Sequence, residues 1–154
     1  MSDLYNGIPP TTAALKNVLA SAGITDPISG EPYTESMLLG IGGGLGAGYI
    51  LWEFKAHNSA TIVMGFRNRW NYTVDYMTHA LQRISVTPHF AETGGVKKAQ
   101  SNLADALANG HAAAVWVDKA HLPYQHLPES MQGHVGHIVT VYSQDDEAVQ
   151  VADL

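Results

Sequence analysis

The apolar positions along the 154-residue chain follow two different spacings. In the first two-thirds, apolar residues recur every three or four positions, which predicts helices, whereas near the C-terminus they alternate with polar residues, which predicts strands. Pro10 suits a first helical turn, and Gly23 and Gly110 suit positions just beyond helix ends. The predicted helices cover residues 10–22 and 34–39, a segment from Asn71 or Thr73 to Ile84, and residues 96–108; the predicted strands cover residues 49–54, 60–66, 85–91, 112–117, 133–142 and 148–153.

The last two strands flank a short acidic linker, residues 143–147, and therefore predict a β-hairpin. With the turn centred in this linker, Val141 lies opposite Val149 and His137 lies opposite Asp153. Opposed Cβ atoms in such a pair are about 4.5–5.5 Å apart, so an imidazole and a carboxylate are expected to meet at the open end of the hairpin. A carboxylate that orients a histidine provides two of the three parts of a catalytic triad, although an ordinary surface ion pair has the same sequence pattern.

Helices in the first two-thirds of the chain and strands at its end are typical of an α+β fold with a mostly antiparallel sheet. The length suits a single domain over residues 1–154, with enough chain to bury a core. Residues 119–133 are expected to form a long loop, and a loop of that length in a small domain is usually functional or a lid. Because the chain stops one residue after Asp153, at a strand end, we expect it to be the N-terminal piece of a larger protein.

The composition excludes several kinds of chemistry. The formal charge is −6, and the chain lacks the clustered Lys and Arg that contacts with nucleic-acid phosphates require. There is no cysteine, which removes disulfides, thiolate metal sites and a cysteine nucleophile together. No secretory leader opens the chain and no apolar run reaches the roughly 18 residues of a membrane span, so a cytoplasmic protein without a membrane partner is predicted.

The glycine-rich segment 40–48 loosely matches a dinucleotide-binding fingerprint through Gly42, Gly44 and Ala47. That fingerprint needs a strand before the glycines and a helix after them, and the predicted order here is the reverse. We therefore expect these glycines to permit tight turns and close packing against a neighbouring element.

The histidines near the C-terminus do not form a metal-binding pattern. His134 and His137 are three positions apart, a spacing that puts them on opposite faces of a strand. His121 and His126 lie in the long loop without cysteine or clustered carboxylates nearby, whereas zinc usually has three or four such ligands. We expect solvated loop histidines, with no metal or other cofactor.

The start of the first predicted helix, at Pro10, Thr11 and Thr12, is a further candidate site. Free backbone N–H groups and the helix macrodipole stabilise an anion there by about 0.3–1 kcal/mol, which also makes such a place a good one for a thiolate nucleophile. A helix start followed along the chain by a histidine and an aspartate is one arrangement used for Cys-His-Asp chemistry. This chain has a proline and two threonines instead, and helix capping is the simplest role for the threonines.

Two residues around the long loop, and the tryptophans, also have expected roles. Asp118 ends the strand before the loop and is a candidate cap for the next turn. Tyr124 either lines a pocket or anchors the loop onto the core. Trp52, Trp70 and Trp116 are expected in the core or at its edge.

Four segments carry a resemblance to a known family: Thr12–Leu19, Glu35–Gly46, Asp118 with Leu122–Tyr124, and Gly136–Val139 through Val151–Asp153. In this order they resemble the N-terminal domain of butirosin biosynthesis protein H and its relatives. That domain is similar in turn to papain-like and bacteriocin-processing cysteine peptidases. The resemblance covers nearly the whole chain and implies a papain-like α+β fold, with N-terminal helices packed on a mostly antiparallel sheet.

The resemblance also implies a transferase with a Cys-His-Asp triad. The best-known member of the family moves an acyl group from an acyl carrier protein thioester to an aminoglycoside amine. Carried over by position, the histidine is His137, the acid is Asp153 and the nucleophile falls on Pro10. Proline has neither a nucleophile nor an N–H group, and Thr11 or Thr12 would need strong activation to replace it.

We therefore predict a degenerate papain-like domain that lacks its nucleophile and serves as a binding or scaffolding module in a biosynthetic pathway. Its ligand would be the arm of an acyl carrier protein, a peptide or a small amine, with Asp118 and Tyr124 as candidate binding residues. One alternative is an active acyltransferase or amidohydrolase that uses a threonine of the first helix or a water activated by His137. Another is a structural assembly domain with protein contacts through loop 119–133. The sequence leaves open whether the protein is a homo-oligomer.

Overall fold

The structure of the protein, a computed structural model, describes four stretches of the chain: residues 9–43, 48–65, 73–145 and 147–153. Within these stretches the chain forms four α-helices and two small antiparallel sheets, which confirms the predicted mixed α+β class. The chain divides into two compact units, of which one combines Met1–Glu35 with Phe90–Leu154 and the other is Ser36–His89. The single domain expected over the whole chain stays a prediction.

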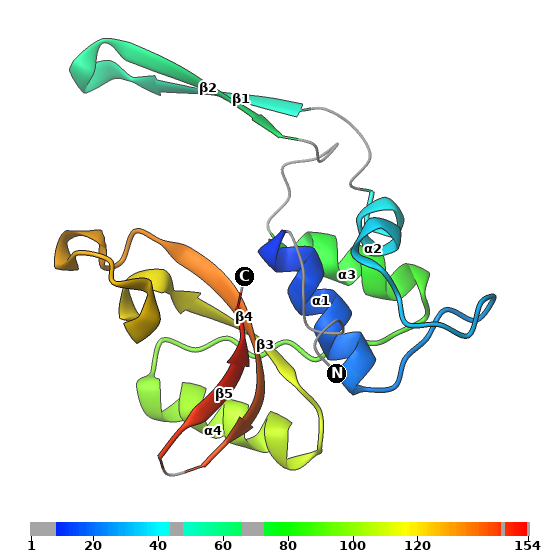
Figure 1. Cartoon of the computed structure of the whole chain (residues 1–154). Coiled ribbons are helices and arrows are strands. Elements are labelled where there is room, and N and C mark those ends of the chain that lie inside the picture. Colours follow the sequence, from blue (N-terminus) through cyan, green and yellow to red (C-terminus); the bar gives the residue numbers. More distant parts are fainter. Residues whose placement is uncertain (1–8, 44–47, 66–72, 146, 154) are drawn as a thin grey trace. The chain divides into compact units, whose positions relative to one another are not determined.

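The first unit consists of a three-stranded sheet and two helices (Figure 1). Its strands are β3 (Ala113–Asp118), β4 (Gly136–Gln144) and β5 (Val149–Ala152), which are antiparallel in the order β3-β4-β5. Helices α1 (Pro10–Ser21) and α4 (Val96–Ala108) both contact β3 and β4. The expected packing of an N-terminal helix on an antiparallel sheet is therefore present for α1, and α4 has the predicted bounds.

Local sequence accounts for both ends of α1. Pro9 has extended backbone angles (φ −92°, ψ 128°), and Pro10 occupies the first turn, where its missing N–H costs no helical hydrogen bond. Gly23 follows the helix with φ +68°, a left-handed conformation that glycine adopts without steric cost. Between these ends an apolar face that includes Leu15 and Leu19 is buried, and burying one such side chain contributes about 1.5–3 kcal/mol.

β4 is the central strand of this sheet and the core of the first unit. Ile138, Val139, Thr140 and Val141 are consecutive and all buried, so both faces of the strand are covered. Their β-branched side chains suit a pleated, packed surface. One of them is polar, and its Oγ1 atom, in Thr140, is buried without a hydrogen-bond partner in the described part of the chain.

The predicted C-terminal hairpin is confirmed, but its predicted register is wrong. Val141 pairs with Val151 rather than with Val149, and a β-bulge at Tyr142 shifts the pairing beyond it, so that Gln144 faces Val149. Valines at alternate positions on both strands satisfy either register, which is why the apolar pattern did not distinguish them. A displacement of two residues keeps each side chain on its original face, because side chains alternate with period two.

The second unit contains α3 (Thr73–Arg83), most of α2 (Glu35–Ile41), and the antiparallel strands β1 (Gly48–Phe54) and β2 (Ser59–Gly65). All four elements lie within two residues of their predicted bounds. Within the described stretches, no helix has the length and apolar character needed to cross a membrane.

A close approach between α2 and α3 explains one of the glycines. Tyr76 of α3 is buried, and its hydroxyl donates a 2.7 Å hydrogen bond to the carbonyl oxygen of Leu38 in α2. A Cβ atom at Gly42 would lie 2.2 Å from the Tyr76 ring, so only glycine fits there without a shift of the ring. The prediction of close packing is confirmed at Gly42, whereas residues 44–47 of the cluster lie outside the described stretches.

Two further predictions from the sequence are wrong. Residues 85–91 form no strand, and Pro88 within them lacks the N–H that a sheet ladder requires. Trp52 and Trp116 are 53% and 45% exposed rather than buried, because sheets of two and three strands leave part of such large side chains uncovered. Trp70 lies outside the described residues.

We expect Thr140→Val to stabilise the protein by about 1 kcal/mol, because valine has the same shape and removes a buried hydroxyl that has no partner among the described residues. Urea denaturation followed by circular dichroism measures the change. Thr12→Val is the matched control. Thr12 is as buried as Thr140, but its hydroxyl is hydrogen-bonded to Pro9 and Glu35, so this variant should lose about 1–2 kcal/mol. Equal losses in both variants would contradict the expectation.

Candidate functional site

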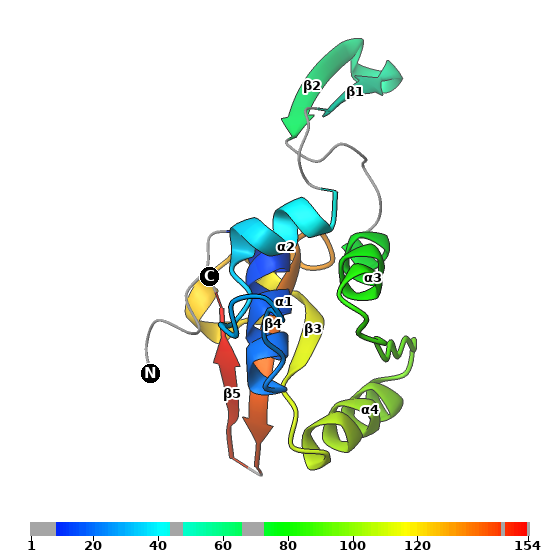
Figure 2. The same ribbon diagram turned by 90° about the vertical axis from the view of Figure 1, so that its right-hand side faces the viewer.

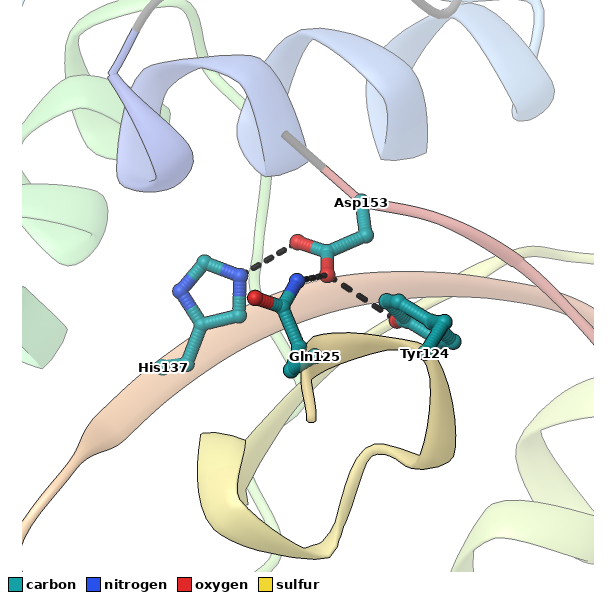
Figure 3. A network of polar contacts seen from close by, with 4 residues as sticks. All are labelled: Tyr124, Gln125, His137 and Asp153. Carbon is teal, nitrogen blue, oxygen red and sulfur yellow. Dashed lines mark hydrogen bonds and ion pairs between the residues drawn. The ribbon is translucent and has the colours of Figure 1, made fainter. Parts of the chain in front are cut away.

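His137 and Asp153 are joined across the β4–β5 hairpin (Figure 3). Nε2 of the imidazole donates a hydrogen bond to Oδ1 of the carboxylate, and only 7% and 9% of the two side chains is exposed. The contact expected from the sequence is therefore present, but the two residues are not directly opposed. Asp153 continues β5 beyond the pairing of Ala152 with Thr140, so the imidazole and the carboxylate meet along a diagonal.

The second carboxylate oxygen of Asp153 is held by the long loop between β3 and β4. Oδ2 accepts a 2.9 Å hydrogen bond from the Tyr124 hydroxyl and a 3.1 Å hydrogen bond from Nε2 of Gln125. Both donors come from one 3₁₀ turn of the loop, and Figure 3 shows both reaching the same oxygen. Because both oxygens are bonded, the carboxylate plane and the orientation of the His137 ring are fixed together.

Only one of the two imidazole nitrogens of His137 is hydrogen-bonded to a described residue. Nε2 of His137 faces Asp153, and Nδ1 makes no hydrogen bond to any described residue. Figure 3 shows Nδ1 pointing away from the carboxylate. With Nε2–H committed to the acid, Nδ1 can take a proton from a group placed beside it, as a general base oriented by a carboxylate does.

The start of α1 lies at the same end of the first unit as this pair. Figures 1 and 2 both place the first turn of α1 near the C-terminal end of β5, and α1 appears beside His137 and Asp153 in the close-up of Figure 3. Pro10, the position expected to carry a nucleophile, is the first residue of that turn. The fold therefore brings the helix start, the imidazole and the carboxylate into one region of the first unit.

The two threonines after Pro10 are buried and do not cap the helix. The Thr12 hydroxyl lies 3.1 Å from the carbonyl oxygen of Pro9 and 2.9 Å from Oε2 of Glu35, so two acceptors already share its one proton. The capping prediction is wrong because Pro9 occupies the cap position and the threonines come too late in the turn. From inside the helix, a Thr hydroxyl reaches back to a carbonyl oxygen rather than to a free N–H.

Asp118 fastens the two ends of the long loop. Its carboxylate accepts a 3.0 Å hydrogen bond from the backbone N–H of Ala120 and another from the backbone N–H of Gly133. These two hydrogen bonds, the one from Gly133 first, lower the pKa of Asp118 below its usual range. Asp118 caps the turn that opens the loop, as predicted, whereas its role in binding stays a prediction.

Tyr124 takes one of the two roles expected from the sequence. Its hydroxyl anchors the loop to Asp153, and no described contact tests whether its ring lines a binding pocket. A pocket of about 420 Å³ does lie in the first unit, between α4 and the end of β4. It is lined by Ala104, Leu107 and Ala108 of α4 and by residues 142–145, so none of the predicted site residues contributes to it.

Sequence reasoning missed two residues of this region, Gln125 and Glu35. Gln125 directly follows Tyr124, so a second polar side chain in the same loop turn was the available indication. Glu35 opens one of the four segments of the family resemblance, but nothing local connected it with Thr12. In the described part of the chain, no three His, Asp or Glu side chains gather as a metal ion would require.

The protein is a mixed α+β domain with a buried His–Asp pair near the start of a helix. Comparison with family profiles then identifies its family: the chain belongs to the family described as Butirosin biosynthesis protein H, N-terminal, which matches residues 10–154. The match confirms the resemblance found in the sequence, and it begins at the first residue of α1. A search of curated proteins and a search of solved structures found no match.

We expect the Tyr124 phenol to ionise late. Partial desolvation first, and then the hydrogen bond and charge of Asp153, raise the pKa of Tyr124, which is 47% exposed, to about 12 from its usual 10.0. The contribution of this group to folding stability is therefore fully present below about pH 10 and is lost as the pH rises toward 12. Ultraviolet titration of the phenolate, compared between the wild type and Tyr124→Phe, isolates the group. Asp153→Asn should move the pKa back toward 10, and an unchanged value in that variant would rule out the carboxylate as a cause.

Proposed function

We propose that this chain is a papain-like domain that has kept the histidine and the acid of a Cys-His-Asp site and has lost its nucleophile. It serves as a binding or scaffolding module in a biosynthetic pathway. One observation carries this proposal: Asp153 orients the imidazole of His137 near the start of α1, where the first residue is Pro10. Proline provides no nucleophile, and the chain has no cysteine elsewhere.

The choice of imidazole nitrogen that faces the acid supports the papain-like assignment. In a triad, one imidazole nitrogen faces the acid and the other faces the nucleophile. Here Nε2 of His137 faces Asp153, which leaves Nδ1 as the nitrogen that would face a nucleophile. The order along the chain, a helix start followed by His137 and then Asp153, agrees with the order expected for this family.

The buried state of the threonines argues against an active enzyme that uses them. The Thr12 hydroxyl is bonded to Pro9 and Glu35 rather than to the imidazole, and at 1% exposure a substrate cannot reach it without displacing its neighbours. Thr11 is only 9% exposed, and it makes no hydrogen bond to His137 in the described structure. The enzymatic alternative that remains is attack by a water that His137 activates.

The ligand we propose is the arm of an acyl carrier protein, a peptide or a small amine, bound beside His137. The long loop, residues 119–133, is the segment that would contact this ligand. Asp118 closes the base of this loop, and Tyr124 ties its tip to Asp153. A loop fixed at both places can contribute to binding without a large cost in ordering. Self-association into a homo-oligomer is compatible with this role.

Pro10→Cys tests the geometry behind the proposal. Because the chain has no other cysteine, this variant carries a single thiol. A thiol at a helix start beside an imidazole has its pKa lowered from about 8.5 toward 7 or below, so alkylation by iodoacetamide at pH 6 should be at least about tenfold faster than for an ordinary thiol. The rate should fall when His137→Ala is added.

The matched control is Val96→Cys, which puts a thiol at the first residue of α4. That helix also lacks a side-chain cap and acidic residues in its first turn, but Lys97 and Lys98 follow directly, so the variant reports a helix start with two added positive charges and no imidazole. His137→Ala should leave the rate at position 96 unchanged, and a rate at position 10 that does not respond to His137→Ala would end the papain-like interpretation of the site.

A turnover screen separates the binding module from the enzyme. An acyl-N-acetylcysteamine thioester is offered with a panel of primary amines to the wild type and to His137→Ala. We expect no acyl transfer or hydrolysis above the buffer rate with either protein, because no group at the helix start can attack. Turnover by the wild type that disappears in His137→Ala would replace the proposal with the enzyme that uses an activated water.

A further inference from the structure

The hairpin formed by β1 and β2 has an apolar face that the described residues leave exposed to solvent (Figure 1). Its register pairs Tyr49 with Met64 and Leu51 with Ile62, so these four side chains project from one face. Their exposed fractions are 74%, 78%, 49% and 64%, respectively. We call these four residues the hairpin face. Single apolar side chains are normal on a surface, whereas a contiguous group of them marks a place of contact.

The opposite face of the same hairpin is also apolar, but it is less exposed. It carries Trp52, Phe54 and Val63, whose exposed fractions are 53%, 47% and 38%. A two-stranded hairpin by itself is only marginally stable in water and needs further packing against one of its apolar faces. The hairpin face has the larger exposed fractions, so it is the side on which we expect this additional packing.

The distribution of charge favours a second copy of the chain as the partner of this face. Residues 48–65 contain one acidic residue, Glu53, and one basic residue, Lys55, so the formal charge of the hairpin is zero, whereas the whole chain carries −6. β2 contains no charged residue and no proline, which are the residues that usually protect exposed strands from contact with other chains. A charged partner therefore finds little complementary charge here, whereas a neutral apolar face is complementary to its own copy.

The exposed area of the hairpin face is sufficient for a weak dimer. With about 200 Å² of surface for a large apolar side chain, the four exposed fractions amount to roughly 500 Å² per copy. Two copies would then bury about 1,000 Å² in total, which is the lower limit for a specific interface. We therefore expect micromolar rather than nanomolar affinity.

We propose that the hairpin face is the interface of a homodimer, in which the hairpins of two copies stack face to face about a two-fold axis. Stacked sheets lie about 10 Å apart, so the side chains of both copies interdigitate into a small apolar core. The same patch serves both copies, as two-fold symmetry requires. Glu53 is exposed beside the turn of the hairpin, at the end of this face, and stays in water there. The inference goes beyond the proposed function and is independent of the site around His137.

Sedimentation velocity of the whole chain, from about 1 μM to about 500 μM, tests the dimer. The wild type should change from monomer to dimer within this range. Ile62→Lys and Thr61→Lys are a matched pair, because both add one positive charge to β2 at an exposed position, but on opposite faces. Ile62→Lys should weaken dimerisation at least about thirtyfold, whereas Thr61→Lys should change it less than about threefold. A wild type that stays monomeric throughout, or equal effects of the two variants, would refute the interface.

A variant of β1 distinguishes face-to-face stacking from pairing of two copies through the outer edge of β2. Leu51 lies opposite Ile62 on the same face, but it belongs to the other strand. In the stacked dimer, Leu51→Lys should therefore weaken dimerisation about as strongly as Ile62→Lys does. In a dimer formed through the β2 edge, Leu51 would lie away from the contact. Unchanged dimerisation of Leu51→Lys would refute face-to-face stacking.

Hydrogen exchange of the wild type provides a test that does not depend on the folding of any variant. Stacking stabilises a marginal hairpin, so the backbone amides of β1 and β2 should exchange more slowly as the protein concentration rises through the range of dimer formation. The amides of α4, which has no part in the interface, should exchange at the same rate at every concentration. Exchange in the hairpin that does not depend on concentration, or an equal change in α4, would refute the interface.

Discussion

The carboxylate of Asp153 is the group on which the candidate site depends. It follows the last strand, bonds to His137 on the central strand, and accepts hydrogen bonds from Tyr124 and Gln125 in the long loop. A buried carboxylate is costly unless it is hydrogen-bonded, and each hydrogen bond to a charged group contributes about 1.5–3 kcal/mol. The three donors from the described residues therefore couple the pairing of β5, the docking of the loop and the orientation of the imidazole into one arrangement.

The sequence predicted those features that depend on neighbouring residues. Pro10 and Gly23 mark the ends of α1 to within a residue, and alternating valines give the C-terminal hairpin. The meeting of His137 and Asp153 could be predicted for a more general reason. Alternation fixes which face a side chain occupies but not its exact partner, so the contact is present although the predicted register was two residues out.

The features that the sequence did not predict depend on contacts between distant segments. Gln125 reaches Asp153 from 28 positions away and Glu35 reaches Thr12 from 23, and no local pattern encodes either contact. The bulge at Tyr142 carries no glycine to mark it. Exposure of large side chains such as tryptophan depends on what covers a sheet, which propensity does not describe.

In the proposed function, Pro10 takes the place of a nucleophile, which changes the electrostatics of the site as well as its chemistry. A thiolate at this place would have balanced the positive end of α1, whereas proline leaves that end without an anion in the first turn. The pair of His137 and Asp153 is nevertheless fully formed, so its geometry is held by the sheet and the loop and does not depend on a nucleophile. Under the proposed function, one substitution at position 10 would therefore remove the chemistry of the site while the histidine and the acid keep their geometry.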